Sequence, residues 1–523
     1  MPSDRPTELA GEPAGAYRAI AAAAACVALL AITLRLYLIF STHATEEDFY
    51  ITLRYAENLA HGAGLVFNPG EHVLGTTTPL YTLLLAAAVR GRLDPVLFGK
   101  LLAAAADAGS CMFAWRMGRA LGRPIAGLCA AVVLAAAPLN LTVSVKGMES
   151  SLTACACIGA WSLWAEQRTT GAWICAGLAV LLRIDATLLT VILLAACVLR
   201  DRRPPWTGLA VFAVMTAPWL LYASLTFGSP VPTSLRAKLI VYGWHSASRF
   251  PNLVPFLHEM AHSPLGILLA VGALAAVLGV AAASRDHPLA PSHPHALLLA
   301  PLLAWLAVYY GGMAFSKVFL FGWYYLPPTP AYYLAACVGW AWLAEAAVRR
   351  FGRRPIVVRS ASGAAAACVA AAGLLALFTV PRVARTLRDS QRVEEELRIP
   401  IGLWLKAHAA PGDTVMLEPI GYIGYFSGLR VLDTVGLVSP QVLPFYRQAE
   451  ASPYHAIWQR FRPQWVLLRA GEWSDLRRYE STLRPGEWLE ADYRLARTWR
   501  SPGDRPDAPP SFLLFHRIDG PAE

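Results

Sequence analysis

Charge is the scarcest property of this chain. Asp, Glu, Lys and Arg make up only 15% of its 523 residues, whereas hydrophobic residues make up 56%. An average soluble domain carries about 25% charged residues. The composition therefore excludes an ordinary soluble protein and indicates a polytopic membrane protein.

Cysteine is missing from the polar parts of the chain, and so is any long basic arm. All nine cysteines lie in apolar runs between Cys26 and Cys368, which argues against disulfides and against a thiolate metal site. The net charge is +10, but the basic residues are divided among short turns. We therefore expect no nucleic-acid partner.

Long hydrophobic runs, by contrast, are abundant. Crossing about 30 Å of hydrocarbon takes roughly 20 mostly apolar residues, and about eleven such runs occur up to Val380. Every second loop is basic, for example RDRRPP at 200–205 and RRFGRRP at 349–355. Because cytoplasmic loops collect Lys and Arg, this order predicts a multi-pass protein with a cytoplasmic N-terminus and an extracytoplasmic C-terminal part.

Composition divides the chain into three parts. Residues 1–15 predict a disordered cytoplasmic tail, and residues 16–380 predict an α-helical transmembrane domain whose short run Leu80–Val89 is an interfacial or re-entrant helix. Residues 381–523 predict a small α/β domain on the outer face. It should begin with a charged helix at Thr386–Ala409, include a helical GYIGYF segment, and carry strands at Thr414–Leu417, Arg430–Leu432, Trp465–Leu468 and Ser511–His516.

The outer loop at 41–79 carries the strongest functional signal. Glu46, Glu47 and Asp48 follow the first apolar run within a few residues, so their carboxylates should lie at the depth of the membrane surface. One acid of the pair Glu47 and Asp48 could act as a general base toward a hydroxyl, while the other orients a sugar or holds a divalent metal. The alternative is a solvated helix start, which Thr45 and the following acids also suit.

Four more clusters of ionisable residues are predicted at the outer face, where such groups are costly beside a span and tend to be functional. The cations of the last two suit a lipid phosphate. The alternatives are plain ion pairs for the first two clusters, snorkelling anchors for the third and an aromatic belt for the fourth. The clusters are Lys146 with Glu149, Arg183 with Asp185, Arg236 with Lys238, and Lys317 with Trp323, Tyr324 and Tyr325.

Asp107 is the one acid deep inside an apolar run, and we expect it to make a helix-packing hydrogen bond. A transporter of a lipid-linked or small anionic substrate is the alternative function. It would need ionisable groups near the bilayer midplane and broken helices in two related halves. Asp107 alone does not supply that pattern.

Five segments together resemble the GT-C superfamily of membrane glycosyltransferases, in the bacterial branch of the arabinofuranosyltransferases, which is related to the aminoarabinose and protein mannosyl transferases. The first, EDFYITLRYAENLAHGAGLVFNPGEHVLGTTTPLY at 47–81, resembles the first outer loop of that family. The other four resemble family segments in order and spacing. They are GMESSLTA at 147–154, LLRIDA at 181–186, FGSPVPTSLRAKL at 227–239 and GYIGYFSGLRVLDTVGLVSP at 421–440.

The resemblance implies a glycosyltransferase that moves a hexosyl or pentosyl group from a polyprenyl-phosphate donor to a hydroxyl of a cell-envelope glycan or lipid acceptor. The expected reaction is inverting and takes place at the outer face of the bacterial inner (plasma) membrane. Asp48 is the expected general base, because Glu47 stands where relatives often have Asp. No cofactor is assigned, and participation of a divalent metal stays open.

The resemblance also assigns binding residues. The expected contacts with the donor phosphate are Arg236, Lys238 and Lys317. The expected substrate contacts are Tyr50, Arg54, Glu149, Arg183, Asp185, Trp323 and Tyr324.

Overall fold

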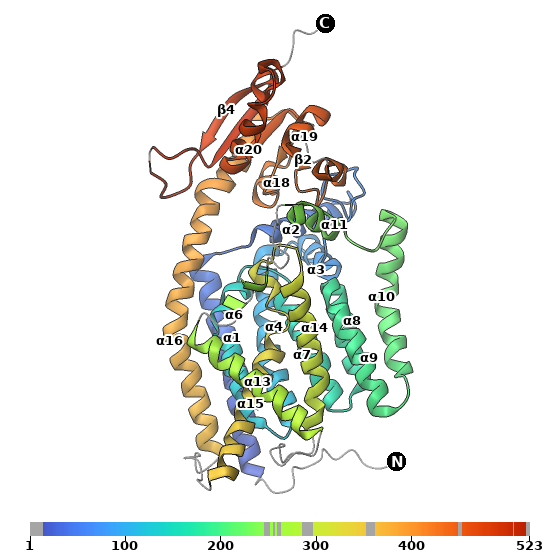
Figure 1. The fold of residues 1–523 in the computed structure, drawn as a ribbon, viewed down its shortest axis with the longest axis vertical. Helices are drawn as coiled ribbons and strands as arrows, with labels where there is room; N and C mark the ends of the chain where they lie inside the picture. Colours follow the sequence, from blue (N-terminus) through green and yellow to red (C-terminus); the bar gives the residue numbers. More distant parts are fainter. Residues whose placement is uncertain are drawn as a thin grey trace.

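The computed structural model describes residues 14–244, 252–254, 257–258, 263–284, 296–351, 361–447, 452–505 and 507–518. A bundle of long helices forms most of the molecule, and a smaller α/β layer lies at one end of it (Figure 1). The first helix starts at the opposite end. Of the tail predicted at 1–15, residues 1–13 lie outside the described residues, and residues 14 and 15 belong to the first helix.

Among the described residues, seven helices are long and apolar enough to cross a membrane, and a helix pair bent by 54° is an eighth candidate. The chain is therefore a multi-pass membrane protein, as its composition predicted. The bent pair is α5 (Pro124–Ala136) with α6 (Pro138–Ser144). The seven are α1 (Ala14–Thr42), α4 (Pro95–Ala120), α10 (Trp206–Phe227), α13 (Pro264–Ala283), α14 (Ala300–Phe315) with the short η2 (Ala296–Leu299) before it, α15 (Thr329–Phe351) and α16 (Ala361–Val393).

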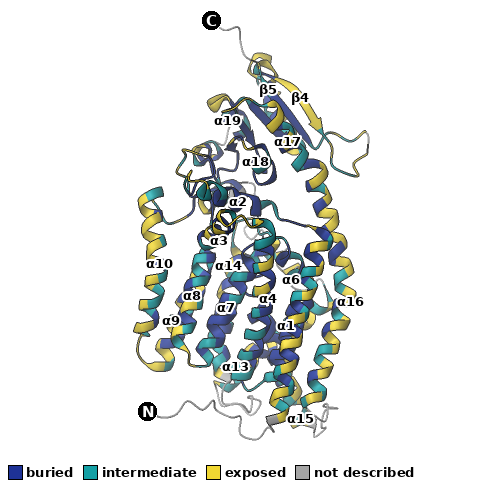
Figure 2. Ribbon diagram, turned by 180° about the vertical axis from the view of Figure 1, so that it is seen from behind, coloured by how far each residue is buried: buried dark blue, intermediate teal, exposed yellow. Residues whose placement is uncertain are grey.

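Three shorter helices complete the bundle: α7 (Ser150–Ala165), α8 (Thr169–Leu182) and α9 (Thr187–Asp201). At 1.5 Å per residue, the longest of them covers about 24 Å, less than the hydrocarbon thickness. The predicted number of about eleven spans stays a prediction. The bundle is buried along α4 and α7, whereas α10 at its rim exposes many residues (Figure 2). Exposed apolar side chains on α10, such as Val214 and Leu225, suit contact with lipid.

A buried ion pair connects three helices of the bundle. Arg35 of α1 donates from Nε to Asp107 of α4 at 2.8 Å, and it also donates to the carbonyls of Leu134 and Ala135 at 2.9 and 2.5 Å. These carbonyls lie at the end of α5, where intrahelical donors run out. The predicted packing role of Asp107 is thus filled by a full ion pair, with a partner, Arg35, that the sequence pattern did not single out.

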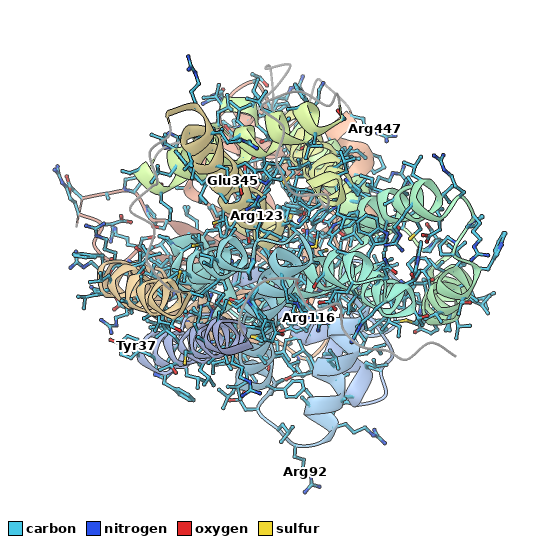
Figure 3. The ribbon with its side chains drawn as sticks, turned by 90° about the horizontal axis from the view of Figure 1, so that it is seen from below. Tyr37, Arg92, Arg116, Arg123, Glu345 and Arg447 are labelled. Atoms are coloured by element: carbon cyan, nitrogen blue, oxygen red, sulfur yellow. The ribbon has the colours of Figure 1, made fainter. Side chains whose placement is uncertain are left out.

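Figure 3 views the molecule from the end of the bundle away from the α/β layer, where Arg116, Arg123 and Glu345 are labelled. There, Arg116 donates from Nε to Glu166 at 3.0 Å, and Arg123 pairs with Glu345. This is the end that the loop charges predict to be cytoplasmic. The orientation in the membrane stays a prediction.

The α/β layer grows directly out of the last span. Helix α16 continues through a five-residue π-helical turn, η4 (Glu394–Arg398), into α17 (Ile399–His408), so the predicted charged helix is an extension of the span. A five-stranded sheet follows in the order β2-β1-β3-β5-β4. Strands β2, β1 and β3 are parallel, and β5 is antiparallel to both β3 and β4. The strands are β1 (Thr414–Leu417), β2 (Arg430–Asp433), β3 (Trp465–Arg469), β4 (Tyr493–Trp499) and β5 (Phe512–Arg517).

Short helices cover the sheet. They are α18 (Tyr422–Ser427), η5 (Pro440–Arg447), α19 (Pro453–Phe461), α20 (Ala470–Glu480), η6 (Pro485–Glu487) and α21 (Leu489–Asp492). Three further helices, α2 (Glu47–Ala60), α3 (Pro79–Arg90) and α11 (Thr233–Trp244), lie between the bundle and this layer (Figure 1). With only 12 residues, α3 is the short helix predicted at Leu80–Val89.

Candidate functional site

Helix α2 begins at the junction between the bundle and the α/β layer. Glu46 precedes its first turn, and its backbone N–H donates to the carbonyl of Lys146 at 3.0 Å. The Glu46 carboxylate also pairs with the Lys146 ammonium at 2.8 Å. This contact replaces the predicted pairing of Lys146 with Glu149, because the loop containing Lys146 turns back onto the start of α2. The start of α2 is therefore fixed to the bundle.

One face of α2 holds both ends of α18. The carboxylate of Glu47 accepts from the backbone N–H of Gly421 at 2.5 Å, at the start of α18. Two turns along α2, Arg54 donates to the carbonyls of Gly424 and Leu429 at 2.5 and 2.6 Å, toward the end of α18. A carboxylate at a helix start and a cation at its end both complement the helix dipole. Gly421 is required here, since a Cβ would collide with the Glu47 backbone oxygen.

Aromatic packing fills the space between these two contacts. The Tyr50 ring lies 4.4 Å from the Tyr422 ring and 5.0 Å from the Tyr425 ring, centroid to centroid. The Tyr425 hydroxyl donates to Glu57 at 2.6 Å. Tyr50 and Arg54 were predicted as substrate contacts, but the structure places them at this joint between α2 and α18. We therefore leave both out of the proposed substrate site.

Asp48 points to a different environment. It lies one residue and about 100° further around the helix than Glu47, and its carboxylate makes no hydrogen bond with another described residue. Burial raises the pKa of its carboxyl above the usual range, while the positive charges of Lys238 and Arg183 act in the opposite direction. Asp48 therefore faces a cationic region and keeps its oxygens available.

Arg183 forms the base of that region. Arg183 is 7% exposed, and its guanidinium contacts Glu149 Oε1 and Asp185 Oδ2, each at 2.8 Å. Glu149 precedes α7, and Arg183 and Asp185 lie in the turn between α8 and α9, where the short helix η1 (Ile184–Ala186) interrupts the chain. Glu149 of one predicted cluster thus joins Arg183 and Asp185 of another, with a carboxylate on each side of one cation.

Tyr309 of α14 joins this network from a third direction. Its hydroxyl lies 3.0 Å from Asp185 Oδ2 and 3.2 Å from the backbone oxygen of Tyr324. The Arg183 guanidinium lies 5.0 Å from the centroid of the Tyr324 ring. The sequence reasoning missed Tyr309, although a tyrosine pair just before the predicted cluster at Lys317 is a usable signal.

Lys238 of α11 lies over the same aromatic residues. Its ammonium donates to the Tyr324 hydroxyl at 3.0 Å and lies 5.6 Å from the centroid of the Phe321 ring. Helix α11 is fixed by Thr233, whose hydroxyl contacts the carbonyls of Leu74 in the outer loop and Leu437 in the α/β layer at 2.9 and 2.8 Å. The position of Lys238 therefore depends on both the outer loop and the C-terminal layer.

The other predicted residues divide into two groups. Trp323 is buried and stacks on Phe321 with ring centroids 4.5 Å apart, in the short helix η3 (Gly322–Tyr324) beside Tyr324. Arg236 lies only two residues from Lys238 and thus on another side of α11, where it is exposed, and Lys317 is exposed as well. Neither makes a contact with the cluster within the part of the chain that the structure describes.

The name cationic cluster is used for the two cations that Asp48 faces, Arg183 and Lys238, together with the residues around them, Glu149, Asp185, Tyr309 and Tyr324. Among the described residues, no group of three or more His, Cys, Asp or Glu side chains is placed to hold a metal ion. The Glu47 carboxylate in particular accepts backbone N–H groups of α18. The described residues thus do not fit a metal at Glu47, and we derive no step through one.

Comparison with known proteins gives matches to the C-terminal part and to the overall fold. A family model described as a domain of unknown function (DUF8728) matches residues 385–515. No curated protein matches the sequence.

Solved structures match nearly the whole chain at low sequence identity. ArnT from Cupriavidus metallidurans, bound to undecaprenyl phosphate, has a TM-score of 0.59 at 13% identity, covering 95% of this chain and 98% of that one. The archaeal oligosaccharyltransferase AglB from Archaeoglobus fulgidus, in complex with an inhibitory peptide and a dolichol-phosphate, has a TM-score of 0.55 at 12% identity, covering 97% and 76%.

Proposed function

Since the chain has the fold of the GT-C glycosyltransferases, we propose that it transfers a sugar from a polyprenyl-phosphate donor to a hydroxyl group of an envelope glycan or lipid acceptor. The fold confirms the resemblance seen in the sequence. ArnT and AglB were solved with undecaprenyl phosphate and with a dolichol-phosphate, which supports a lipid-linked donor here. The polyprenyl donor, the hexosyl or pentosyl group and the acceptor class belong to the proposal.

The observation that carries this proposal is that the Asp48 carboxylate has no hydrogen-bond partner among the described residues and faces the cationic cluster. In the proposed reaction, the oxygen of the acceptor hydroxyl attacks the anomeric carbon of the sugar, and Asp48 accepts the proton of that hydroxyl. The bond between that carbon and the phosphate oxygen breaks, and its electron pair leaves with polyprenyl phosphate. One displacement inverts the configuration at the anomeric carbon.

Lys238 is the proposed main contact of the leaving phosphate. The phosphate gains negative charge as the bond to the sugar breaks, so a nearby fixed cation stabilises the transition state more than the ground state. The Lys238 ammonium has three donors, of which one goes to the Tyr324 hydroxyl. The others are left for phosphate oxygens.

Arg183 has a different proposed role. Glu149 and Asp185 compensate its charge from two sides, so it contributes less to anion binding than an unpaired guanidinium would. We propose that Arg183 positions Asp185 and the Tyr324 ring, and that Tyr324 and Trp323 form one wall of the sugar site. The donor-phosphate roles of Arg236 and Lys317 stay predictions from the sequence.

The proposed location follows the predicted topology. The cationic cluster and the α/β layer lie at the same end of the bundle, which we propose to be the extracytoplasmic end of a bacterial inner membrane, with the N-terminus in the cytoplasm. A transporter would need ionisable groups deep in the bundle that are available to a substrate. Asp107 is ion-paired with Arg35, so no observation favours the transporter.

The test is sugar transfer by the purified protein in lipid, with a panel of polyprenyl-phosphate sugars as donors and extracted envelope glycans as acceptors. Release of polyprenyl phosphate reports turnover. We expect Asp48→Asn to lower turnover by about 10³-fold, because a general base contributes roughly 10² to 10⁴-fold. The matched control is Glu47→Gln, an adjacent acid on the other face of α2, which should stay within about tenfold of the wild type.

Each result decides a specific part of the proposal. Equal losses in both variants would contradict the assignment of the base to Asp48 alone. Turnover that survives Asp48→Asn would move the base to another residue while keeping the reaction class. Absence of turnover and of binding with every donor in folded wild-type protein would contradict the reaction class and favour the transporter.

A further inference from the structure

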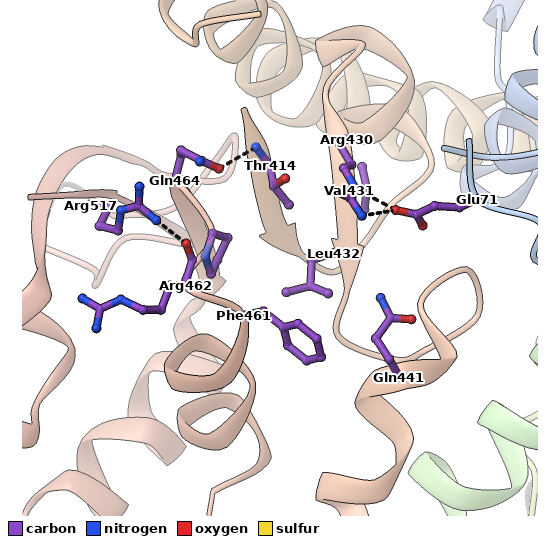
Figure 4. Close-up of a pocket in the computed structure, with 11 residues that line it drawn as sticks. Glu71, Thr414, Arg430, Val431, Leu432, Gln441, Phe461, Arg462, Gln464 and Arg517 are labelled. Atoms are coloured by element: carbon purple, nitrogen blue, oxygen red, sulfur yellow. Dashed lines mark hydrogen bonds and ion pairs between the residues drawn. The ribbon is translucent and has the colours of Figure 1, made fainter. Parts of the chain in front are cut away.

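A cavity lies away from the cationic cluster, at the joint between the outer loop and the sheet. It has a volume of about 340 Å³, which is in the range of small-molecule sites, roughly 300–1,000 Å³. Parallel strands β1, β2 and β3 begin at this edge, and antiparallel β5 ends there (Figure 4). Its polar and aromatic lining comes mainly from Glu71, Arg430, Phe461, Arg462, Gln464 and Arg517.

The lining has an excess of positive charge, since it contains three arginines and one glutamate. Arg430 pairs with Glu71 Oε1 through Nε at 2.7 Å and through one terminal nitrogen at 2.6 Å. Arg462 pairs with Asp492 at 3.2 Å, and Arg517 donates to the backbone oxygen of Arg462 at 2.6 Å. Each guanidinium has five N–H donors in a rigid fork, so these contacts orient all three and leave donors unused on Arg430 and Arg462.

Two neutral side chains complete a site for a polar ring. Gln464 accepts the Thr414 backbone N–H through its side-chain oxygen at 2.9 Å, and its amide nitrogen makes no hydrogen bond to any residue that the structure describes. Phe461 is 36% exposed. Amide groups and guanidiniums bind sugar hydroxyls, and an aromatic face packs against the C–H groups of a sugar ring.

We propose that this cavity binds the acidic group of an anionic saccharide, a carboxylate or a phosphate attached to a sugar. Guanidinium forks match the geometry of both anions, while the Gln464 amide and the Phe461 ring suit the attached sugar. None of the residues of the cationic cluster lines this cavity. The inference therefore goes beyond the proposed transfer reaction, and saccharide binding here does not depend on turnover.

The outer loop has a structural reason to take part. The Asn68 side chain donates to the carbonyl of Val431 at 2.8 Å and accepts its N–H at 3.0 Å, so it pairs with the exposed edge of β2. This contact covers an edge strand and fixes Glu71, three residues later, beside Arg430. The outer loop thus supplies one carboxylate, that of Glu71, to a cavity otherwise lined by the α/β layer.

The experiment measures binding to the full-length protein in lipid nanodiscs by isothermal titration. Four probes are compared: a trisaccharide of galacturonic acid, a neutral trisaccharide, a sugar monophosphate and inorganic phosphate. We expect at least one acidic saccharide to bind about tenfold more tightly than the neutral one and than inorganic phosphate. Arg430→Gln and Arg462→Gln should each weaken that binding about fivefold or more, since each removes one charge-assisted contact.

Two control variants separate this site from other surfaces. Arg478→Gln removes an exposed arginine of the same layer that does not line the cavity, and Asp48→Asn alters the proposed catalytic base; both should leave the binding constant unchanged. Loss of binding in Asp48→Asn would place the saccharide in the cationic cluster and overturn the proposal. So would inorganic phosphate binding as tightly as the acidic saccharides, no binding of either acidic saccharide, or full binding by Arg430→Gln and Arg462→Gln.

Discussion

Glu47 and Asp48 are adjacent in the sequence, yet they lie on two faces of α2 with different surroundings. On the first face, Glu47, Tyr50, Arg54 and Glu57 all contact α18, and their polar groups are matched by backbone or side-chain partners. On the second face, the Asp48 carboxylate makes no hydrogen bond with another described residue and faces Lys238 and Arg183. A helix that separates residues by about 100° can thus serve two purposes with one acidic pair.

The difference is one of polar satisfaction. Buried polar groups are normally paired, and the exceptions call for an explanation. The face toward α18 obeys the rule, as expected for a joint that holds an outer domain in place. On the face toward the cationic cluster, the half-buried Asp48 carboxylate has no hydrogen-bond partner among the described residues, as expected where a substrate supplies one. This comparison can be tested by changing one face and watching whether the other responds.

The largest expected effect, after that of Asp48→Asn, is a loss of activity on changing Lys238 of α11, which lies opposite the second face of α2. Lys238→Gln should lower kcat/KM for the lipid-linked donor by about 10² to 10³-fold, because loss of one donor to a developing anion costs about that much. Arg236→Gln, which removes an exposed charge two residues away on the same helix, should cost at least about tenfold less. Initial rates of polyprenyl phosphate release measure both.

The outcome also shows whether α11 acts through one specific phosphate contact at Lys238 or through its total positive charge. Equal losses in the two variants would mean that α11 attracts the donor through its total charge, and the assignment of Lys238 as a specific phosphate contact would then be wrong. Lys238→Arg should recover part of the lost rate, since the charge is kept but its geometry changes.

A smaller effect is expected on the first face, and it should appear in stability. Arg54→Met leaves buried carbonyls near the end of α18 without their donor, which costs about 2 to 4 kcal/mol. The midpoint of thermal unfolding in detergent should fall, and proteolysis at the joint between the outer loop and the α/β layer should become faster. The control, Arg392→Gln, loses only the exposed pair with Glu396 and should leave the midpoint unchanged.

Catalysis gives the decisive comparison for this variant. At a temperature where Arg54→Met is folded, its KM for the donor should stay close to that of the wild type, because Arg54 lies at the joint. A large rise in KM without loss of stability would restore Arg54 as a substrate contact, as the sequence predicted.

The sequence predicted much of the α/β layer and less of its outer edge. Strands β1, β2, β3 and β5 were placed within about one residue, because each is a short run rich in apolar residues between turn signals. Strand β4 was missed, since its residues Arg494 to Thr498 are all exposed and show no alternation of buried and exposed positions. The sequence gives no sign of this strand, and only the structure shows that β4 pairs with β5.

The candidate site was predictable in its members but not in its pairs. Ionisable residues at the ends of apolar runs identified Asp48, Glu149, Arg183, Asp185 and Lys238. The predicted pairing of Lys146 with Glu149 was wrong. Lys146 pairs with Glu46, which lies 100 residues away in the chain and meets it only because two loops converge. The resemblance assigned Tyr50 and Arg54 to the substrate site. They lie three and seven residues after Glu47, however, and this spacing puts them on the same face of α2 as Glu47.

The smallest expected effect concerns the pH dependence of stability and is measured at Glu47, on the first face. Burial raises the pKa of Glu47 from 4.5 to about 7, although Arg398 lowers it. Between these values the folded protein keeps a proton that the unfolded chain has lost, so stability falls as the pH rises from about 4.5 to about 7 and stays at the lower value above that. The expected loss is about 1 to 3 kcal/mol. In Glu47→Gln this contribution is absent, while the amide oxygen can still accept from α18, so its unfolding midpoint between pH 5 and pH 8 should vary less than that of the wild type. Equal pH profiles in the two proteins would contradict a raised pKa of Glu47 in the folded protein.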